Sequence, residues 1–197
     1  MLRAEDPRVP ELLAGGWATV AHSWGAHVAV DDALVALLRG HLARSVASIH
    51  ELSPDRDAGI VALDELTRDD YPRSAATRHD PVDAAALDAL RADGVRFFGA
   101  VEGERVIAMT ALRRDGDAVE TRFTAVAPDR RRRGLAVAMK ATAMLEAIAE
   151  GATRFGTGGS ALNVASIRMN EACGYVLDER WVTLERPTGP RSVADPS

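Results

Sequence analysis

The strongest constraint on the fold comes from residues 118–150, where a strand pattern, a basic turn and a long helix pattern follow one another directly. The strand pattern, Ala118–Val126, is rich in β-branched and aromatic residues, and Pro128 follows it. Residues 130–134 then read Arg-Arg-Arg-Arg-Gly and open into an apolar-periodic segment over residues 134–150. A helix that starts at such a turn exposes free backbone N–H groups and the positive end of its dipole. The sequence therefore predicts a phosphate-binding site made mostly of backbone.

Within that turn, Gly134 and Ala136 are small residues at the point where a pyrophosphate would approach the helix start. A larger side chain there would block hydrogen bonds to the backbone, and the neighbouring arginines can add charge-assisted bonds. Two other interpretations are a solvated basic turn and a nucleic-acid patch that grips a phosphate backbone. The net charge of −5 and the absence of interleaved aromatic residues argue against nucleic acid.

A second pattern lies at residues 157–175 and ends in Met-Asn-Glu-Ala-Cys-Gly-Tyr. Asn163 and Asn170 are seven residues apart and share one face of a helix that we predict over residues 163–172. Asn163 is equally well explained as the N-cap of that helix. Together with the glycine turn, this pattern resembles the GNAT superfamily of acyl-CoA-dependent N-acetyltransferases, and it is closest to the mycothiol synthase-like branch. The resemblance covers about residues 45–186, with specific motifs only in residues 118–175.

The resemblance implies an α/β (α+β) architecture, the GNAT fold, with a mixed, mostly antiparallel central sheet flanked by helices. Its two central strands splay where the cofactor enters. The implied activity is acetyl transfer from acetyl-CoA, as cosubstrate, to a primary amine of a small molecule by direct attack. The cofactor-binding residues that it implies are Thr124, Ala125, Val126, Arg131, Arg132, Arg133, Gly134, Leu135, Ala136, Asn163 and Asn170.

The chain departs from the family pattern at Asn170, where many members have a tyrosine that donates a proton to the CoA thiolate. Asparagine has no titratable proton in this range, so we expect Asn170 to hold the CoA arm instead. The proton would then come from water or from another tyrosine, for which Tyr71 is the candidate. The missing tyrosine leaves a second hypothesis open, a catalytically weak acyl-CoA-binding or regulatory GNAT-like module.

Glu120 is the candidate general base, because the resemblance places a glutamate with that role on the strand before the cofactor turn. Strict alternation would put Glu120, Arg122 and Thr124 on one face of that strand. The alternative is a solvent-facing Glu120 paired with Arg122. At the end of the strand, the backbone N–H groups of Thr124 to Val126 could stabilise the thioester oxyanion.

The loop over residues 71–81 covers the acceptor site in similar proteins, so Tyr71 and Arg73 are candidate substrate contacts, with Arg78 and His79 nearby. The five histidines are scattered without metal-ligand spacing, so we expect no metal site and assign each histidine a structural or solvated role. Cys173 is expected to fill the core rather than to act as a nucleophile.

We predict an N-terminal extension over residues 1–44, a GNAT domain over residues 45–187 and a disordered tail over residues 188–197. Gly16-Trp17, with a strand and Trp24 after it, resembles Gly174-Tyr175, with a strand and Trp181 after it. Residues 1–30 are therefore either a remnant of a second GNAT repeat or a coincidence of two helix–glycine–aromatic–strand junctions. The patterns also predict separate strands over residues 17–22 and 26–30, and a strand over residues 153–157 that ends at Gly158.

Partners and location follow from composition. No segment is apolar and long enough to span a membrane, and the acidic chain as a whole lacks nucleic-acid-binding character. With a single cysteine the chain cannot form an internal disulfide, which favours a reducing, cytoplasmic compartment. The expected partner is a small-molecule amine, and a homodimer is a possible assembly.

Overall fold

The structure is a computed structural model, and it describes residues 1–45, 47–72 and 79–187. The predicted tail over residues 188–197 and the candidate substrate residues Arg73 and Arg78 lie outside the described residues. The helices and strands, in chain order, are β1 (Leu2–Arg3), α1 (Arg8–Ala14), β2 (Ala18–Ala29), α2 (Asp32–Ala43), β3 (Ile49–Glu51), α3 (Asp57–Thr67), α4 (Ala84–Ala92), β4 (Val95–Glu102), β5 (Arg105–Asp115), β6 (Ala118–Val126), α5 (Leu135–Ala149), β7 (Arg154–Ser160), α6 (Val164–Ala172) and β8 (Val176–Glu185).

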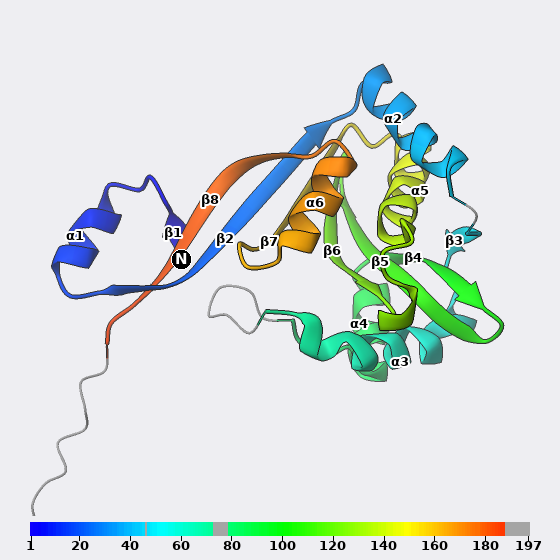
Figure 1. The fold of residues 1–197 in the computed structure, drawn as a ribbon, viewed down its shortest axis with the longest axis horizontal. Coiled ribbons are helices and arrows are strands. Elements are labelled where there is room, and N and C mark those ends of the chain that lie inside the picture. Colours follow the sequence, from blue (N-terminus) through cyan, green and yellow to red (C-terminus); the bar gives the residue numbers. More distant parts are fainter. Residues whose placement is uncertain (46, 73–78, 188–197) are drawn as a thin grey trace, which may run out of the picture.

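The strands of the described residues form one eight-stranded sheet in the order β1-β8-β2-β7-β6-β5-β4-β3 (Figure 1). Neighbouring strands are antiparallel except for β6 and β7, which are parallel. The predicted fold class, a mixed and mostly antiparallel sheet flanked by helices, is confirmed. No helix in the described part of the chain is both long and apolar enough to cross a membrane.

The helices cover the two faces of the sheet unequally. Helices α2 and α5 pack together on one face over a buried cluster that includes Phe98, Met144 and Phe155. On the other face α3 and α4 cover a second cluster, which includes Phe97 and Met109 (Figure 1). Both faces are fully covered only over the β3–β6 half of the sheet, so the β2–β8 half is the thinner one.

The parallel pair β6 and β7 holds together only at one end. Its ladder joins residues 118–120 to residues 154–156, and no further pairs are formed towards Val126 and Ser160. Beyond this ladder β6 remains paired with β5 and β7 remains paired with β2, so each strand is held by its outer neighbour. The two strands therefore enclose an open wedge in the middle of the sheet, which is the splay that the sequence resemblance implied.

Two predicted strand breaks are wrong, and glycine explains both. Residues 18–29 form the single strand β2. Its pairing with β8 shifts register near Val20 and at Gly25, and the strand continues through both shifts. Gly158 and Gly159 belong to β7 instead of ending it. A Cβ at Gly158 would lie 2.9 Å from the carbonyl oxygen of Trp24, so this glycine allows β2 and β7 to approach closely.

The N-terminal and C-terminal strand–helix–strand segments have the same local structure. After helix α1 the chain turns at Gly16, with φ 86°, and the N–H of Trp17 donates to the carbonyl of Leu12 at 3.0 Å. After helix α6 it turns in the same way at Gly174, with φ 88°, where the N–H of Tyr175 donates to the carbonyl of Asn170 at 3.1 Å. The strands after these helices, β2 and β8, pair antiparallel, and their other neighbours are β7 and β1. The segments β1-α1-β2 and β7-α6-β8 are thus interleaved with near two-fold symmetry.

Candidate active site

The wedge between β6 and β7 opens into a cavity of about 890 Å³. Its walls come from β6, the turn before α5, the first two turns of α5, β7, α6 and the connection between α3 and α4. The lining residues include Tyr71, His79, Thr121–Val126, Arg131, Arg132, Gly134–Val137, Lys140, Thr157–Ser160, Asn163 and Asn170. Among the sequence candidates that the structure describes, Glu120 and Arg133 are absent from this wall.

The start of α5 provides the cradle that the sequence predicts. Gly134 is the N-cap residue, with φ 73°, and no side chain caps the helix. A Cβ built at Gly134 would meet no protein atom within 4 Å, so the space above it is open to the cavity. The N–H groups of the first helical turn, from Leu135 to Val137, have no partners within the helix. The backbone and the open space therefore fit a diphosphate group such as that of CoA.

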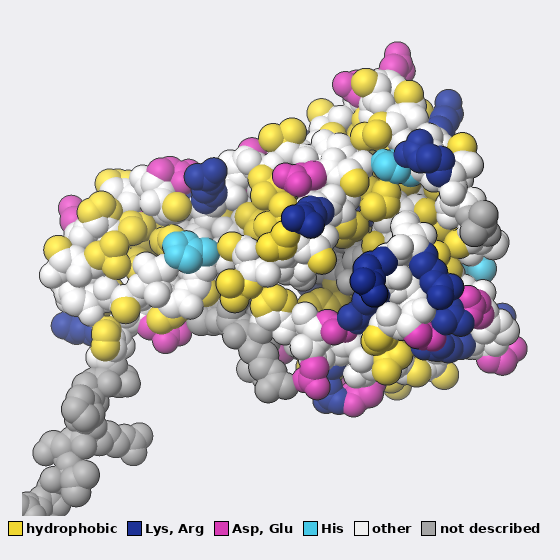
Figure 2. Space-filling view, viewed as in Figure 1, with side chains coloured by type: hydrophobic (Ala, Val, Ile, Leu, Met, Phe, Trp, Pro, Cys, Tyr) yellow, Lys and Arg dark blue, Asp and Glu magenta, His cyan; other side chains and the backbone are white. Residues whose placement is uncertain are grey.

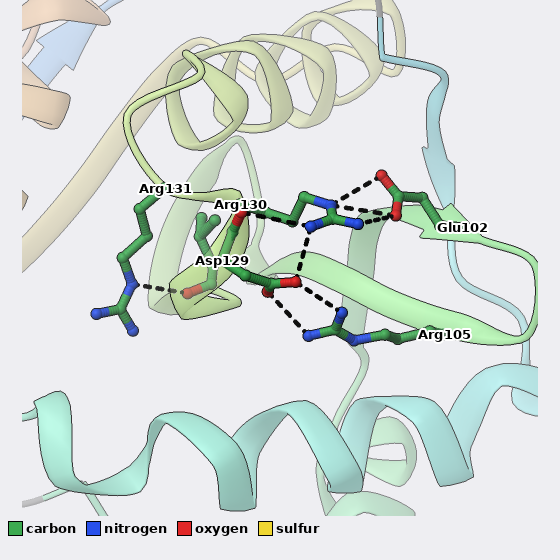
Figure 3. Close-up of polar contacts among 6 residues, drawn as sticks. Glu102, Arg105, Asp129, Arg130 and Arg131 are labelled. Atoms are coloured by element: carbon green, nitrogen blue, oxygen red, sulfur yellow. Dashed lines mark hydrogen bonds and ion pairs between the residues drawn. The ribbon is translucent and has the colours of Figure 1, made fainter.

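The arginines of the turn differ in what they contact. Basic side chains gather over this turn on the surface (Figure 2). Arg130 pairs with Glu102 and Asp129, while the Nε of Arg131 donates to the carbonyl of Val126 at 3.0 Å (Figure 3). Arg131 also pairs with Asp70.

Arg132 and Arg133 are exposed and form no ion pair with any residue that the structure describes. Of these two, Arg132 lines the cavity. Its φ of 60° is uncommon for a residue with a side chain, so the backbone of the turn is left-handed at this position. Arg132 is therefore the turn arginine best placed to receive an anion.

The free edge of β6 presents backbone groups to the wedge. The Tyr71 hydroxyl donates to the carbonyl of Thr124 at 3.5 Å, and Arg131 donates to that of Val126. In a strand the N–H and C=O of one residue point to the same side, so the N–H groups of Thr124 and Val126 also face the cavity. The N–H and C=O of Ala125 point the other way, towards β5, where Ala125 is paired with Met109. Two of the three expected oxyanion donors therefore point into the wedge.

Glu120 lies at the closed end of the wedge, opposite Gly156 in the β6–β7 ladder. A Cβ at Gly156 would overlap its carboxylate, so the glycine makes room for this side chain. Desolvation by the surrounding protein raises the pKa of Glu120, and His27, Lys140 and Arg122 partly oppose that shift. A raised pKa makes a carboxylate a stronger base than an ordinary surface glutamate.

The predicted alternation along β6 is wrong. A β-bulge at Arg122 shifts the register with β5, so that Thr121 faces Leu112 and Phe123 faces Ala111. Val119 packs in the cluster beneath α5, whereas Phe123 packs in the cluster beneath α3 and α4. The bulge therefore puts Glu120 on the same face as Phe123, and Thr124 on the other.

Asn163 and Asn170 both line the cavity, and both already hydrogen bond within the protein. Asn163 is the N-cap of α6, accepting from the N–H of Ser166 at 3.0 Å. Asn170, which is 1% exposed, donates to the carbonyl of Ser166 at 2.8 Å and accepts from the ammonium of Lys140. The N-cap role predicted for Asn163 is confirmed, and a contact of either side chain with CoA stays a prediction.

Sequence reasoning named Tyr71 and His79 as candidates but missed Asp64, with which they form a cluster beside the cavity. His79 Nε2 lies 2.6 Å from Oδ1 of Asp64, which is 1% exposed, and the Tyr71 ring stacks on His79 at 4.0 Å. Asp64 also accepts from the N–H of Val82 at 2.9 Å. Burial and the nearby carboxylates raise the pKa of Tyr71, so its hydroxyl keeps its proton. No sequence spacing connects α3 to the residues before α4, so only the fold reveals this cluster.

Comparison with known proteins agrees with this geometry. Residues 60–175 match the model of the acetyltransferase (GNAT) family. No curated protein matches the sequence. Among solved structures, a GNAT-family protein from Novosphingobium aromaticivorans is 20% identical, with a TM-score of 0.56, over 88% of this chain and 69% of that one.

Two further structures are similar over most of this chain. A GCN5-related N-acetyltransferase from Sphaerobacter thermophilus is 12% identical, with a TM-score of 0.67, over 94% of this chain and 59% of that one. A tandem GNAT protein from the clavulanic acid biosynthesis pathway is 15% identical, with a TM-score of 0.64, over 93% of this chain and 61% of that one. This chain therefore spans about two thirds or less of the length of these proteins. At these identities the likeness establishes the fold.

Proposed function

Because this chain belongs to the acetyltransferase (GNAT) family, we propose that it transfers an acetyl group from acetyl-CoA to a primary amine of a small molecule. The observation that carries the proposal is the cavity between β6 and β7, with the uncapped start of α5 at its wall. One wall offers backbone donors for a diphosphate, and the free edge of β6 offers backbone donors for a thioester oxygen.

The chain's own residues have distinct roles in this proposal. Glu120 takes the proton from the attacking amine, directly or through a water, because its raised pKa suits a base. The N–H groups of Thr124 and Val126 stabilise the developing oxyanion. Tyr71 and His79 line the end of the cavity below α3 and contact the acceptor. Acetyl-CoA, when bound, supplies the activated acyl group.

Two finer points also remain proposals. The mycothiol synthase-like branch is the closest match by motif, and it favours a small-molecule amine over a protein amine. The competing function is an acyl-CoA-binding or regulatory module without useful turnover, favoured by Asn170 in place of the family tyrosine.

A thiol-release assay with acetyl-CoA over a panel of small amines separates the two functions. We expect multiple turnovers with at least one amine. Binding of acetyl-CoA by calorimetry without turnover on any amine would instead support the regulatory module.

Two variants test the site within the same assay. Gly134→Asp puts a carboxylate in the open cradle and should abolish CoA binding. Gly94→Asp is its matched control, because Gly94 also has a positive φ, 77°, and an unobstructed Cβ position, but lies after α4. Glu120→Gln should lower the rate by roughly 10²-fold above the pKa of Glu120, with a smaller loss at low pH, where the wild-type base is itself protonated. Equal CoA affinity in both glycine variants would refute the cradle, and full activity with an unchanged pH profile in Glu120→Gln would assign the base elsewhere.

A further inference from the structure

Lys140 is the single lysine of the chain, and its side chain is completely buried in the wall of the cavity. It lies on α5, six residues after Gly134, or about 9 Å along the helix axis from the phosphate cradle. The exposed cations that line the cavity lie nearer to solvent, and they are Arg122, Arg131, Arg132 and Arg168. A cation this deep requires either a strong partner or a function, because burial strongly disfavours the charged form.

The surroundings of Lys140 only partly satisfy it. The ammonium donates to Oδ1 of Asn170 and lies 4.3 Å from the centroid of the Tyr175 ring. An ammonium has three N–H donors, and Asn170 is its one hydrogen-bond acceptor among the described residues. The hydroxyls of Thr121 and Tyr175 are also buried here, and they interact with each other. Lys140 therefore keeps donor capacity at a point where Thr121 and Thr157 mark the opening of the wedge.

The titratable groups around Lys140 come from three elements. Glu120 of β6 and Cys173, at the end of α6, interact with it electrostatically, and Tyr175 precedes β8. Glu120 packs on the opposite face of the sheet from α5, so the two groups meet across the gap between β6 and β7. Glu120, a base, and Lys140, an ammonium, thus lie on opposite faces of the sheet at the point where β6 and β7 separate.

We propose that Lys140 is the acid that protonates the sulfur of the leaving thiolate, and that Asn170 is the residue that positions it. This inference rests on the acetyl transfer proposed above. The amine nitrogen forms a bond to the acyl carbon, the carbon–sulfur bond breaks, and its electron pair stays on sulfur. Lys140 gives one proton to that sulfur, while Glu120 receives one from the nitrogen. The reaction is proton-neutral, since Glu120 then returns its proton to Lys140 through water.

The electrostatics of the site agree with this role. Desolvation lowers the pKa of Lys140 to about 7, while Cys173 and Glu120 act in the opposite direction. An acid with a pKa close to the working pH gives up and regains its proton readily. Tyr175 and Cys173 are less suitable donors, because burial raises the pKa values of both groups.

The single lysine makes a direct test feasible on the unaltered chain. Lysine labelled with ¹³C at the ε-carbon gives one signal, which reports the protonation of Lys140 as pH is changed. The titration is done for the free protein, with CoA, and with desulfo-CoA, which lacks only the sulfur. We expect CoA to give the signal a second midpoint at higher pH, where its thiol ionises beside Lys140, and desulfo-CoA to leave only the midpoint of the free protein.

The outcomes separate this inference from the proposed function. Equal midpoints with CoA and desulfo-CoA, with calorimetry showing that both bind, would overturn the role of Lys140 and leave the cofactor site intact. Failure of both ligands to bind would overturn the cofactor site, and the role of Lys140 with it.

Variants then distinguish an acid from a structural cation. Lys140→Met should lower kcat by roughly 10²-fold, with little change in KM for acetyl-CoA, and remove the alkaline limb of the kcat profile. Asn170→Ala should shift the midpoint of Lys140 and weaken the same limb. Arg154→Met, which removes an exposed cation on β7, is the control. A folded Lys140→Met protein with an unchanged alkaline limb, or a folded Lys140→Arg protein with full kcat, would overturn the proposal.

Discussion

At the scale of the residue, burying Lys140 costs free energy, because water stabilises an ammonium ion far better than a protein interior does. The folded pKa of about 7 lies below the ordinary value of 10.5. Between these pH values the unfolded chain binds more protons than the folded chain, so the free energy of unfolding rises with pH across this window. The cost of the buried charge is therefore greatest at and below pH 7.

We expect the stability difference between the wild-type chain and Lys140→Met to change in favour of the wild type by up to about 1.4 kcal/mol per pH unit between pH 7 and pH 9. Urea denaturation at each pH measures it. The range stops at pH 9 because Cys173, whose pKa is raised from 9.0 to about 11, lowers the stability of both proteins as pH rises further. A difference that stays constant over the range would show that Lys140 titrates as an ordinary lysine.

At the scale of the element, α3 lies directly on β5 because Gly59 has no side chain. A Cβ at Gly59 would come within 2.6 Å of a methyl carbon of Val106, a stiff β-branched residue. Helix α3 also carries Asp64, so its distance from the sheet sets the position of the His79 cluster.

Gly59→Ala should therefore lower the free energy of unfolding by roughly 1–3 kcal/mol, because overpacking outweighs the gain in helix propensity. Gly40→Ala in α2 is the matched control, since its Cβ would approach only the end of the flexible Arg44 side chain, at 3.5 Å. That control should gain up to about 1 kcal/mol. Thermal and urea denaturation of both variants measure the effect, and a stabilised Gly59→Ala protein would refute the close packing.

The elements that sequence predicts well are those with local signals. Asn163 caps α6 as expected, and the start of α5 follows directly from Gly134. The bulge at Arg122 is different, because it depends on the register of β6 against β5. On α5, Ala141 and Met144 are buried, and Val137, Leu145 and Ile148 are partly buried against the same cluster. Contacts of α5 with both α2 and the sheet widen its buried surface.

The candidate site shows the same limit. The glycine turn could be found from sequence because its residues are contiguous and its chemistry is local. Lys140, Asp64 and His79 come together with their partners only through long-range packing. A buried lysine on an apolar helix is a weak sequence signal, because long side chains usually reach solvent from such positions.

At the scale of the whole molecule, the described sheet does not divide at residue 44, because β2 pairs with both β7 and β8. The matching ends of α1 and α6 and the interleaved strand order support our proposal that the N-terminal segment is the remnant of a second repeat. The predicted domain limits stay a prediction.

Two truncations test how far the N-terminal segment is integrated. Removing residues 1–16 deletes β1 and α1, whose ties to β8 are a two-residue ladder, one further backbone hydrogen bond from Ala4, and contacts of Arg3 with Glu179 and Trp181, so that protein should fold. Removing residues 1–30 also deletes β2 and leaves β8 without a central neighbour. We expect that protein to be aggregated or unfolded by size-exclusion chromatography and near-ultraviolet circular dichroism. A monodisperse, folded product of the longer deletion would show that β2 is an accessory strand.

The interleaving of β1, β8, β2 and β7 also determines when the sheet can be completed during synthesis. The antiparallel run from β3 to β6 is contiguous in sequence, so it can form as soon as residues 49–126 are made. Strand β2 is made earlier but must wait for residues 154–185, since both of its neighbours come from there. Until then a twelve-residue strand has two open edges, which favours aggregation and chaperone capture of the nascent chain.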